Sequence, residues 1–263
     1  MSAENSHRRS MSSSTAILSV WSRDCKRVIR NKAVLPSIFV IPAIFVAIFY
    51  GAFSRATENY GITYPTFLLP AGILQGLIFT AGGSALAVAQ DAEDGIHARI
   101  RTMPAPDWSL VGGRLLADLT RAAISIVPVI LLTTLLGARF RGGAVDLLLL
   151  VLLTVGMALA ISAMCDGLCL LAQHPVSTSL MFQGLTIPIV MLSTAFVPAD
   201  ALPDGVRPVI RHLPLSTMID TARFLLDGQS PGSTGIEALC WIVVFLVAGI
   251  VGFLAAISRK SHV

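Results

Sequence analysis

Residues 90–106, QDAEDGIHARIRTMPAP, gather the side chains of this sequence that are best placed to do chemistry. Three carboxylates, Asp91, Glu93 and Asp94, precede the guanidinium groups of Arg99 and Arg101. Closely spaced carboxylates can hold a divalent cation, but acidic residues first and basic residues last are also typical of a short helix. The stretch therefore predicts either metal-dependent chemistry or a charged helix that another protein moves.

The metal interpretation can be compared with the phosphotransferase motif Asp-Gly-x2-Ala-Arg-x8-Gly-x3-Asp-x3-Asp, which is typical of CDP-alcohol phosphotransferases. Four residues match its beginning: Asp94, Gly95, Ala98 and Arg99. The later glycine and the two aspartates are replaced by Trp108, Gly112 and Leu116. Because a cation would have too few oxygen ligands, a membrane-embedded lipid phosphotransferase is kept only as an alternative.

Other reactive groups are sparse. The chain has three lysines, Lys26, Lys32 and Lys260, and none follows a glycine-rich phosphate loop. Cys165 and Cys169 are two soft ligands without a second pair, and small buried side chains explain them better. We therefore expect no catalytic residue, metal or cofactor site in this chain.

The composition indicates a helical membrane protein, because 54% of the 263 residues are hydrophobic and 13% are charged, against roughly 25% charged in soluble domains. Mean hydropathy is +0.77. Runs of ~20 apolar residues can cross a bilayer as helices. Six spans are predicted: 33–53, a segment within 62–90, 115–138, 147–165, 176–197 and 238–257. The third span contains Asp118 and Arg121, three residues apart, which we expect to pair at the membrane interface.

The sequence predicts a disordered N-terminus over 1–14, an amphipathic interface helix over 15–32, a six-helix all-α membrane domain over 33–257 and a cytoplasmic tail over 258–263. No secretory signal is recognised, since the first apolar run follows a basic segment and is long enough to span. Thirteen Lys and Arg residues fall on the side of the two termini and six on the other. The positive-inside rule therefore predicts cytoplasmic termini and a cytoplasmic 90–106 loop.

Residues 15–32 place Ile17, Trp21, Cys25 and Val28 on one helical stripe. This pattern predicts a helix along the membrane surface with Trp21 at headgroup level. Four basic residues would face anionic lipid: Arg23, Lys26, Arg27 and Arg30. A solvated basic tail is the alternative.

Two further patterns concern packing. The connection over 198–237 contains Pro198, Pro203, Pro208 and Pro214 but stays apolar, which predicts one or two short re-entrant or extracellular helices shielded by protein. Gly72 and Gly76 form a small-xxx-small pair that favours close approach of a neighbouring helix, in this chain or in a second copy.

The mechanical interpretation of 90–106 predicts a short coupling helix. Acidic residues would begin it and Pro104 would end it. An apolar stripe formed by Ile96, Ile100 and Met103 suits docking in a groove of another protein. The alternative is a helix that packs on its own membrane domain. The predicted coupling residues are Asp91, Glu93, Asp94, Gly95, Ile96, Arg99, Ile100, Arg101, Met103 and Pro104.

Four stretches together resemble the membrane subunits of ABC-2 type transporters, in particular those of the daunorubicin/doxorubicin-resistance exporters. They are RDCKRVIRNKAVLPSIFVIP before and into the first span, DAEDGIHARIRTMP followed by VGGRLLAD, LGARFRGG after the third span, and AFVPADALPDGVRPVIRHLPLSTMIDTARFLLDG after the fifth. The positions that carry the second stretch are Asp91, Glu93, Gly95, Arg99, Arg101, Pro104, Gly113 and Arg114.

The resemblance implies a permease subunit of an ATP-driven exporter in a bacterial cytoplasmic membrane. It implies two ABC ATPase subunits, a second permease that is identical or related, and contact with membrane lipid but not with nucleic acid. The largely apolar spans favour an amphipathic cargo such as a drug, a lipid or a glycolipid. A carrier that works without ATP is the alternative within transport.

Overall fold

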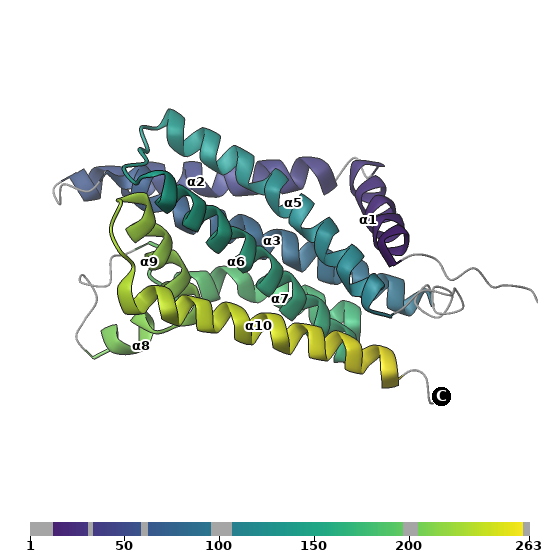
Figure 1. Cartoon of the computed structure of the whole chain (residues 1–263). Helices are drawn as coiled ribbons and strands as arrows, with labels where there is room; N and C mark the ends of the chain where they lie inside the picture. Colours follow the sequence, from purple (N-terminus) through teal and green to yellow (C-terminus); the bar gives the residue numbers. More distant parts are fainter. Residues whose placement is uncertain (1–12, 31–33, 59–62, 96–106, 197–204, 260–263) are drawn as a thin grey trace, which may run out of the picture.

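The computed structural model describes residues 13–30, 34–58, 63–95, 107–196 and 205–259, and within these ranges the regular structure is entirely helical (Figure 1). The helices are α1 (Ser13–Arg30), α2 (Val34–Glu58), α3 (Tyr64–Glu93), α5 (Asp107–Leu135), α6 (Ala144–Leu171), α7 (Pro175–Met191), α8 (Arg207–Arg211), α9 (Pro214–Leu226) and α10 (Gly232–Arg259). The all-α membrane class predicted from composition is confirmed.

Five helices, α2, α3, α5, α6 and α10, are long and apolar enough to cross a membrane. They correspond to five of the six predicted spans. The fifth predicted span, 176–197, contains α7, whose 17 residues extend about 25 Å at ~1.5 Å per residue. That is shorter than the ~30 Å hydrocarbon core, so the sixth span stays a prediction.

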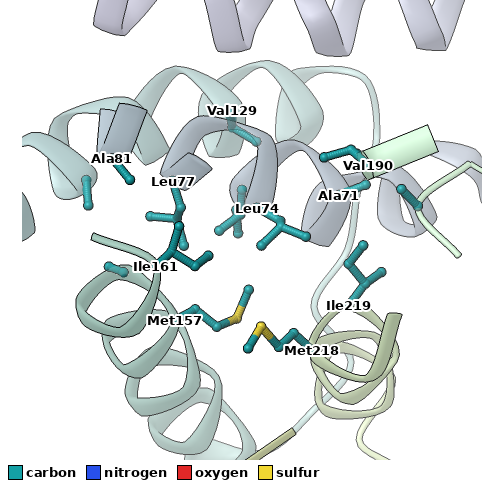
Figure 2. Packing of buried hydrophobic residues seen from close by; sticks show 14 of the residues in the cluster. Ala71, Leu74, Leu77, Ala81, Val129, Met157, Ile161, Val190, Met218 and Ile219 are labelled. Carbon is teal, nitrogen blue, oxygen red and sulfur yellow. The ribbon is translucent and has the colours of Figure 1, made fainter. Parts of the chain in front are cut away.

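Helix α3 is the centre of the bundle and contacts α2, α5, α6, α7 and α9. Its Leu74 and Leu77 are almost completely buried and meet side chains from three other helices in one apolar cluster. Figure 2 shows these partners, Val129 of α5, Met157 of α6 and Met218 of α9, around the two leucines. Being surrounded by protein explains why the α3 sequence is apolar on every side.

The glycine pair on α3 lets two helices of the same chain approach closely. A Cβ on Gly72 would lie 2.9 Å from side-chain carbons of both Val46 in α2 and Val129 in α5. A Cβ on Gly76 would lie 3.2 Å from the hydroxyl of Ser125 in α5. The predicted close neighbour is therefore within this chain, and these glycines do not require a second copy.

Helices α6 and α10 make a second close contact. A Cβ on Gly167 would overlap the carbonyl oxygen of Gly249, and a Cβ on Gly249 would overlap the carbonyl carbon of Ala163. Larger residues would push the two backbones apart. This contact ties α10, which follows the short helices, to the rest of the bundle.

The bundle has two different ends. Helix α1, the end of α3, the start of α5 and the last turns of α6 and α10 lie at one end, and α8 and α9 lie at the other (Figure 1). The ends of α1 and α10 thus share a side, as predicted for the two termini. Helices α8 and α9 are the short helices predicted between the last two spans, and Met218 and Ile219 of α9 are fully buried in the core.

Candidate functional site

The site begins at the C-terminal end of α3, where the apolar run meets its first charges. Asp91 and Glu93 belong to the last turn of this helix, Asp94 caps it and Gly95 follows with φ +69°. The prediction that the acidic residues begin a new helix is therefore wrong for Asp91 and Glu93. The helix continues until a glycine adopts the left-handed conformation that commonly ends helices. The remaining predicted coupling residues, Ile96, Arg99, Ile100, Arg101, Met103 and Pro104, lie outside the described residues.

Asp91 is buried and is bound by three arginines. Its Oδ2 accepts hydrogen bonds from Arg114 Nη2 at 2.7 Å and Arg23 Nη2 at 3.1 Å, and its Oδ1 accepts one from Arg27 Nη1 at 2.8 Å. A carboxylate near a helix C-terminus opposes the helix dipole, and a buried charge needs paired partners. The three guanidinium groups meet both requirements, so Asp91 is a junction of α1, α3 and α5. We call Asp91, Arg23, Arg27 and Arg114 the Asp91 cluster.

Helix α1 presents its basic residues in two directions. Arg23 and Arg27 face the protein, where Arg27 also donates to Gln90 and Arg23 also pairs with Asp24. Lys26 and Arg30 are exposed. The indole N–H of Trp21 donates to Thr120 Oγ1 at 3.1 Å. A helix is present where the sequence predicts one, over Ser13–Arg30. Its Trp21, Arg23 and Arg27 bond to side chains of α3 and α5 in this chain, and its place along the membrane surface stays a prediction.

The sequence VGGR explains how α1 approaches α5. A Cβ on Gly113 would lie 2.6 Å from Val20 Cβ and 2.9 Å from the Ile17 carbonyl oxygen. Only a residue without a side chain allows this distance between the helices. Arg114, the next residue, reaches Asp91 with 4% of its side chain exposed. The glycine thus fixes the separation of α1 and α5, and the arginine completes the Asp91 cluster.

A second group of charges lies one to two turns further along α5. Arg121 Nη1 donates to Asp118 Oδ1 at 2.7 Å, which confirms the predicted pair, but both side chains are at least 91% buried instead of lying at a wet interface. Asp166 of α6 is also buried. The predicted fourth span ended at residue 165, whereas α6 continues to Leu171. In the sequence, the sign that Asp166 is buried is its position as a single carboxylate within the apolar run CDGLCLL.

At the other end of the bundle, Arg223 of α9 binds backbone groups of two helix ends. It donates to the carbonyl oxygens of Phe67, Thr194 and Ala195 at 3.2, 2.8 and 3.0 Å. It also pairs with Asp220 at 2.9 Å, and its guanidinium carbon lies 3.5 Å from the centre of the Phe67 ring. Burial lowers the pKa of Arg223 to about 10, against the opposing effect of Asp220, so the side chain stays charged at neutral pH.

The two stretches LGARFRGG and RFLLDG, far apart in the sequence, meet beside Arg223. The Arg141 amide donates to the Leu226 carbonyl at 2.9 Å. A Cβ on Gly142 would lie 2.7 Å from the Leu225 carbonyl oxygen. The end of α9 is therefore seated on the loop between α5 and α6.

Comparison with known proteins decides what these motifs belong to. Residues 15–226 match the family described as ABC-2 type transporter, a range that runs from α1 to the end of α9. This chain is an ABC-2 type transporter membrane subunit. The matched range contains every residue of the Asp91 cluster and Arg223.

Relatives of this ABC-2 subunit extend over most of its length. It is 24% identical over 228 residues to the daunorubicin resistance ABC transporter permease protein DrrB1 of Streptomyces coeruleorubidus, covering 87% of this chain and 77% of the relative. It is 26% identical over 250 residues to the probable doxorubicin resistance ABC transporter permease protein DrrC of Mycobacterium tuberculosis, covering 93% and 86%. The resemblance found in the motifs is confirmed.

The ABC-2 bundle encloses an apolar cavity of about 300 Å³ between α3, α6, α7, α9 and α10. Its lining includes Ile78, Ile161, Phe182 and Phe245, with Thr186 and Ser193 as the polar members. Within the described ranges, no three His, Cys, Asp or Glu side chains are grouped to hold a metal ion. The arrangement suits binding of an apolar group and movement of helices.

Proposed function

We propose that this chain is the permease of an ATP-driven exporter in a bacterial cytoplasmic membrane, acting with two ABC ATPase subunits and a second permease. The proposal includes α7 as the sixth span and places both termini and the α1 end in the cytoplasm. ATP and Mg²⁺ would bind to the ATPase subunits. The observation that carries the proposal is the Asp91 cluster, which joins α1, α3 and α5 where the connection 96–106 begins.

Force would enter through the end of α3. Glu93 and Asp94 are exposed there and are available to a partner surface, together with the predicted coupling residues that follow. Asp91 is buried, so its role is internal: it would transmit displacement of the α3 end to α1 and α5. The nucleotide in the partner supplies the energy, and this chain needs two states with different contacts to that partner.

The proposed cargo is an amphipathic compound such as a drug, a lipid or a glycolipid. Two features support it: the apolar cavity of about 300 Å³ between α3, α6, α7, α9 and α10, and the drug-resistance names of the relatives. A volume near 300 Å³ is at the lower end for ligand pockets, so the cavity would take an apolar part of the cargo.

The test is the double substitution Glu93→Ala/Gly95→Pro, with Gly137→Pro as the matched control. Gly95 has φ +69° and Gly137 has φ +101°, and proline fixes φ near ~−65°. Both changes disturb a helix-ending glycine, but only the first lies at the α3 end. We expect the double variant to insert in the membrane yet lose ATPase association or export, while the control retains both.

Normal export by the double variant would contradict the proposal. Co-purification separates the alternatives. An ATPase with a phosphate-binding loop that stays with the permease supports the exporter. Full transport by the purified chain alone in vesicles would support a carrier that works without ATP, and metal-dependent transferase activity without a partner would support a lipid phosphotransferase.

A further inference from the structure

A second cavity, of about 310 Å³, lies beside the Asp91 cluster and differs in character from the apolar one. Side chains from α1, α2, α3, α5 and α7 enclose it. Charged, polar and apolar side chains line it, among them Arg27, Arg121, Gln90, Gln183, Phe79 and Leu86. We call it the mixed cavity, because polar and apolar groups both line it.

The charged groups in the lining of the mixed cavity are both cations. Arg121 and Arg27 line it, and no carboxylate is among the lining residues. Arg121 is 91% buried and gives Nη1 to Asp118, although a guanidinium has five N–H donors. Arg27 gives Nη1 to Asp91 and Nη2 to Gln90 and is 44% exposed. Two cations therefore line the mixed cavity, and the carboxylates that pair with them, Asp91 and Asp118, are not part of its lining.

The amide groups of Gln90 and Gln183 and the hydroxyls of Ser37 and Thr80 add neutral polar groups to the lining. Gln183 Nε2 donates to the Gly82 carbonyl at 3.2 Å, which ties α7 to α3 at this point. Apolar side chains form the remainder, among them Ile38, Phe79 and Leu86. Gly83 is exposed, and a Cβ there would meet nothing within 4 Å. The mixed cavity is therefore open beside Gly83 of α3, and the charged side chains of Arg27 and Arg121 also line it.

We propose that the mixed cavity binds the headgroup of an anionic amphiphile, a phosphate or carboxylate with an attached apolar chain. Guanidinium groups bind these anions with strong, often bidentate hydrogen bonds, and a partly buried site strengthens them relative to water. The apolar chain lies against Phe79 and Leu86. A cationic amphiphile is disfavoured, since its charge would face Arg27 and Arg121 without a lining carboxylate. The inference rests on the proposed exporter function and adds that the ligand carries a negative charge.

The same chemistry could come from a membrane lipid or from the cargo, so the experiment has arms for both. Binding to the purified full chain is measured by native mass spectrometry with dodecyl phosphate, dodecyltrimethylammonium, phosphatidylglycerol and phosphatidylcholine. Gly83→Leu places a side chain in the mixed cavity, and its Cβ would meet no atom within 4 Å, so no neighbouring group has to move. Gly51→Leu is its control, because Gly51 is also exposed, also has an open Cβ direction and is not in the lining.

We expect wild type to bind dodecyl phosphate at least about tenfold more tightly than dodecyltrimethylammonium. Gly83→Leu should lower the affinity for dodecyl phosphate by about tenfold, which is the size of effect that loss of a charge-assisted hydrogen bond has. Arg27→Gln removes one cation and should weaken it about threefold or more, with the exposed Arg55→Gln unchanged. If these variants also bind phosphatidylglycerol more weakly, the site takes a lipid headgroup. If only their binding of dodecyl phosphate is weaker, the site takes a single-chain anion, as expected of cargo.

Three results would overturn the inference: equal affinity for the two dodecyl ions, undiminished dodecyl phosphate binding in Gly83→Leu, or equal weakening in Gly51→Leu. The measurement uses no ATPase and no nucleotide. Failure of the exporter proposal would appear in the Glu93→Ala/Gly95→Pro experiment, whereas failure of this site would appear in the binding data alone.

Discussion

Helices α1 and α9 are both short, and each lies at one end of the bundle, but they are held by different forces. Two of the three ion pairs on Asp91 come from Arg23 and Arg27 of α1, whose side chains are 38% and 44% exposed. Arg223 of α9 is 13% exposed, and Met218 and Ile219 beside it are fully buried. Exposed ion pairs are screened by water and salt, whereas apolar burial and bonds to fixed carbonyls are not.

The difference indicates which end can move. Burial of large apolar side chains is worth roughly 1.5–3 kcal/mol each, so separating α9 from α3 and α6 would have a high free-energy cost. Arg23 and Arg27 are partly exposed, so water can replace their hydrogen bonds to Asp91, and loss of either contact costs less than loss of the buried Arg114. We therefore expect α1 to separate from the bundle more easily than α9. The following changes test this contrast.

The largest effect is expected from Asp91→Asn. The substitution removes the charge that three arginines share, and Arg114 is deeply buried. Loss of one partner in a buried ion pair costs about 3–5 kcal/mol. We expect a lower free energy of unfolding in detergent and faster trypsin cleavage within α1, at Arg23, Lys26 or Arg27. Glu93→Gln, in the same last turn but exposed, is the control and should change neither. Equal trypsin resistance of Asp91→Asn and wild type would contradict the role of Asp91 as a junction.

Arg223→Gln should have the next largest effect, at the opposite end. It removes the charge from contacts with three carbonyl oxygens and leaves Asp220 with its hydrogen bond from Thr194. Hydrogen bonds to charged groups contribute about 1.5–3 kcal/mol, so we expect a loss of that size in unfolding free energy. Trypsin cleavage within α1 should not change, because α1 and α9 lie at opposite ends of the bundle (Figure 1). The exposed Arg139→Gln is the control, and accelerated cleavage of α1 in Arg223→Gln would show that the ends are coupled.

Much of this arrangement was predictable from the sequence. Apolar runs predict six spans, and five of them are long helices in the structure. The apolar stripe of 15–32, flanked by basic residues, predicts α1, and the proline-rich apolar sequence predicts α8 and α9. The spacing of Asp118 and Arg121 predicted their pair. These features depend on neighbours within a few turns, which periodicity records.

The contacts between distant segments were not predictable in this way. Asp91 looked like the start of a helix because its charge suits an N-terminus, and only the positions of Arg23, Arg27 and Arg114 in space make it suit the end of α3. The sequence around Gly113 does not distinguish it from other glycines in apolar helices, and its role follows from the position of α1 against it. Asp166 lies one residue past the predicted fourth span, and its single charge in an apolar run does not by itself place it in the core. Each of these depends on long-range packing, which local spacing does not contain.

The smallest effect is expected from Gly113→Ala, which tests how closely α1 must approach α5. The new Cβ would lie 2.6 Å from Val20 Cβ, so α1 must move outward, at a cost of about 1 kcal/mol or somewhat more. The neighbouring Gly112→Ala is a matched control, because its Cβ would lie 3.5 Å from Ile17 Cδ1, an ordinary contact, and alanine favours a helix over glycine. We expect Gly113→Ala to lengthen the bonds of Arg23 and Arg27 to Asp91 and to raise the rate of trypsin cleavage in α1, more strongly in high salt, while Gly112→Ala is unchanged or slower. If both alanines gave the same rate, the separation of α1 and α5 would not be set by Gly113, and the ion pairs alone would position α1.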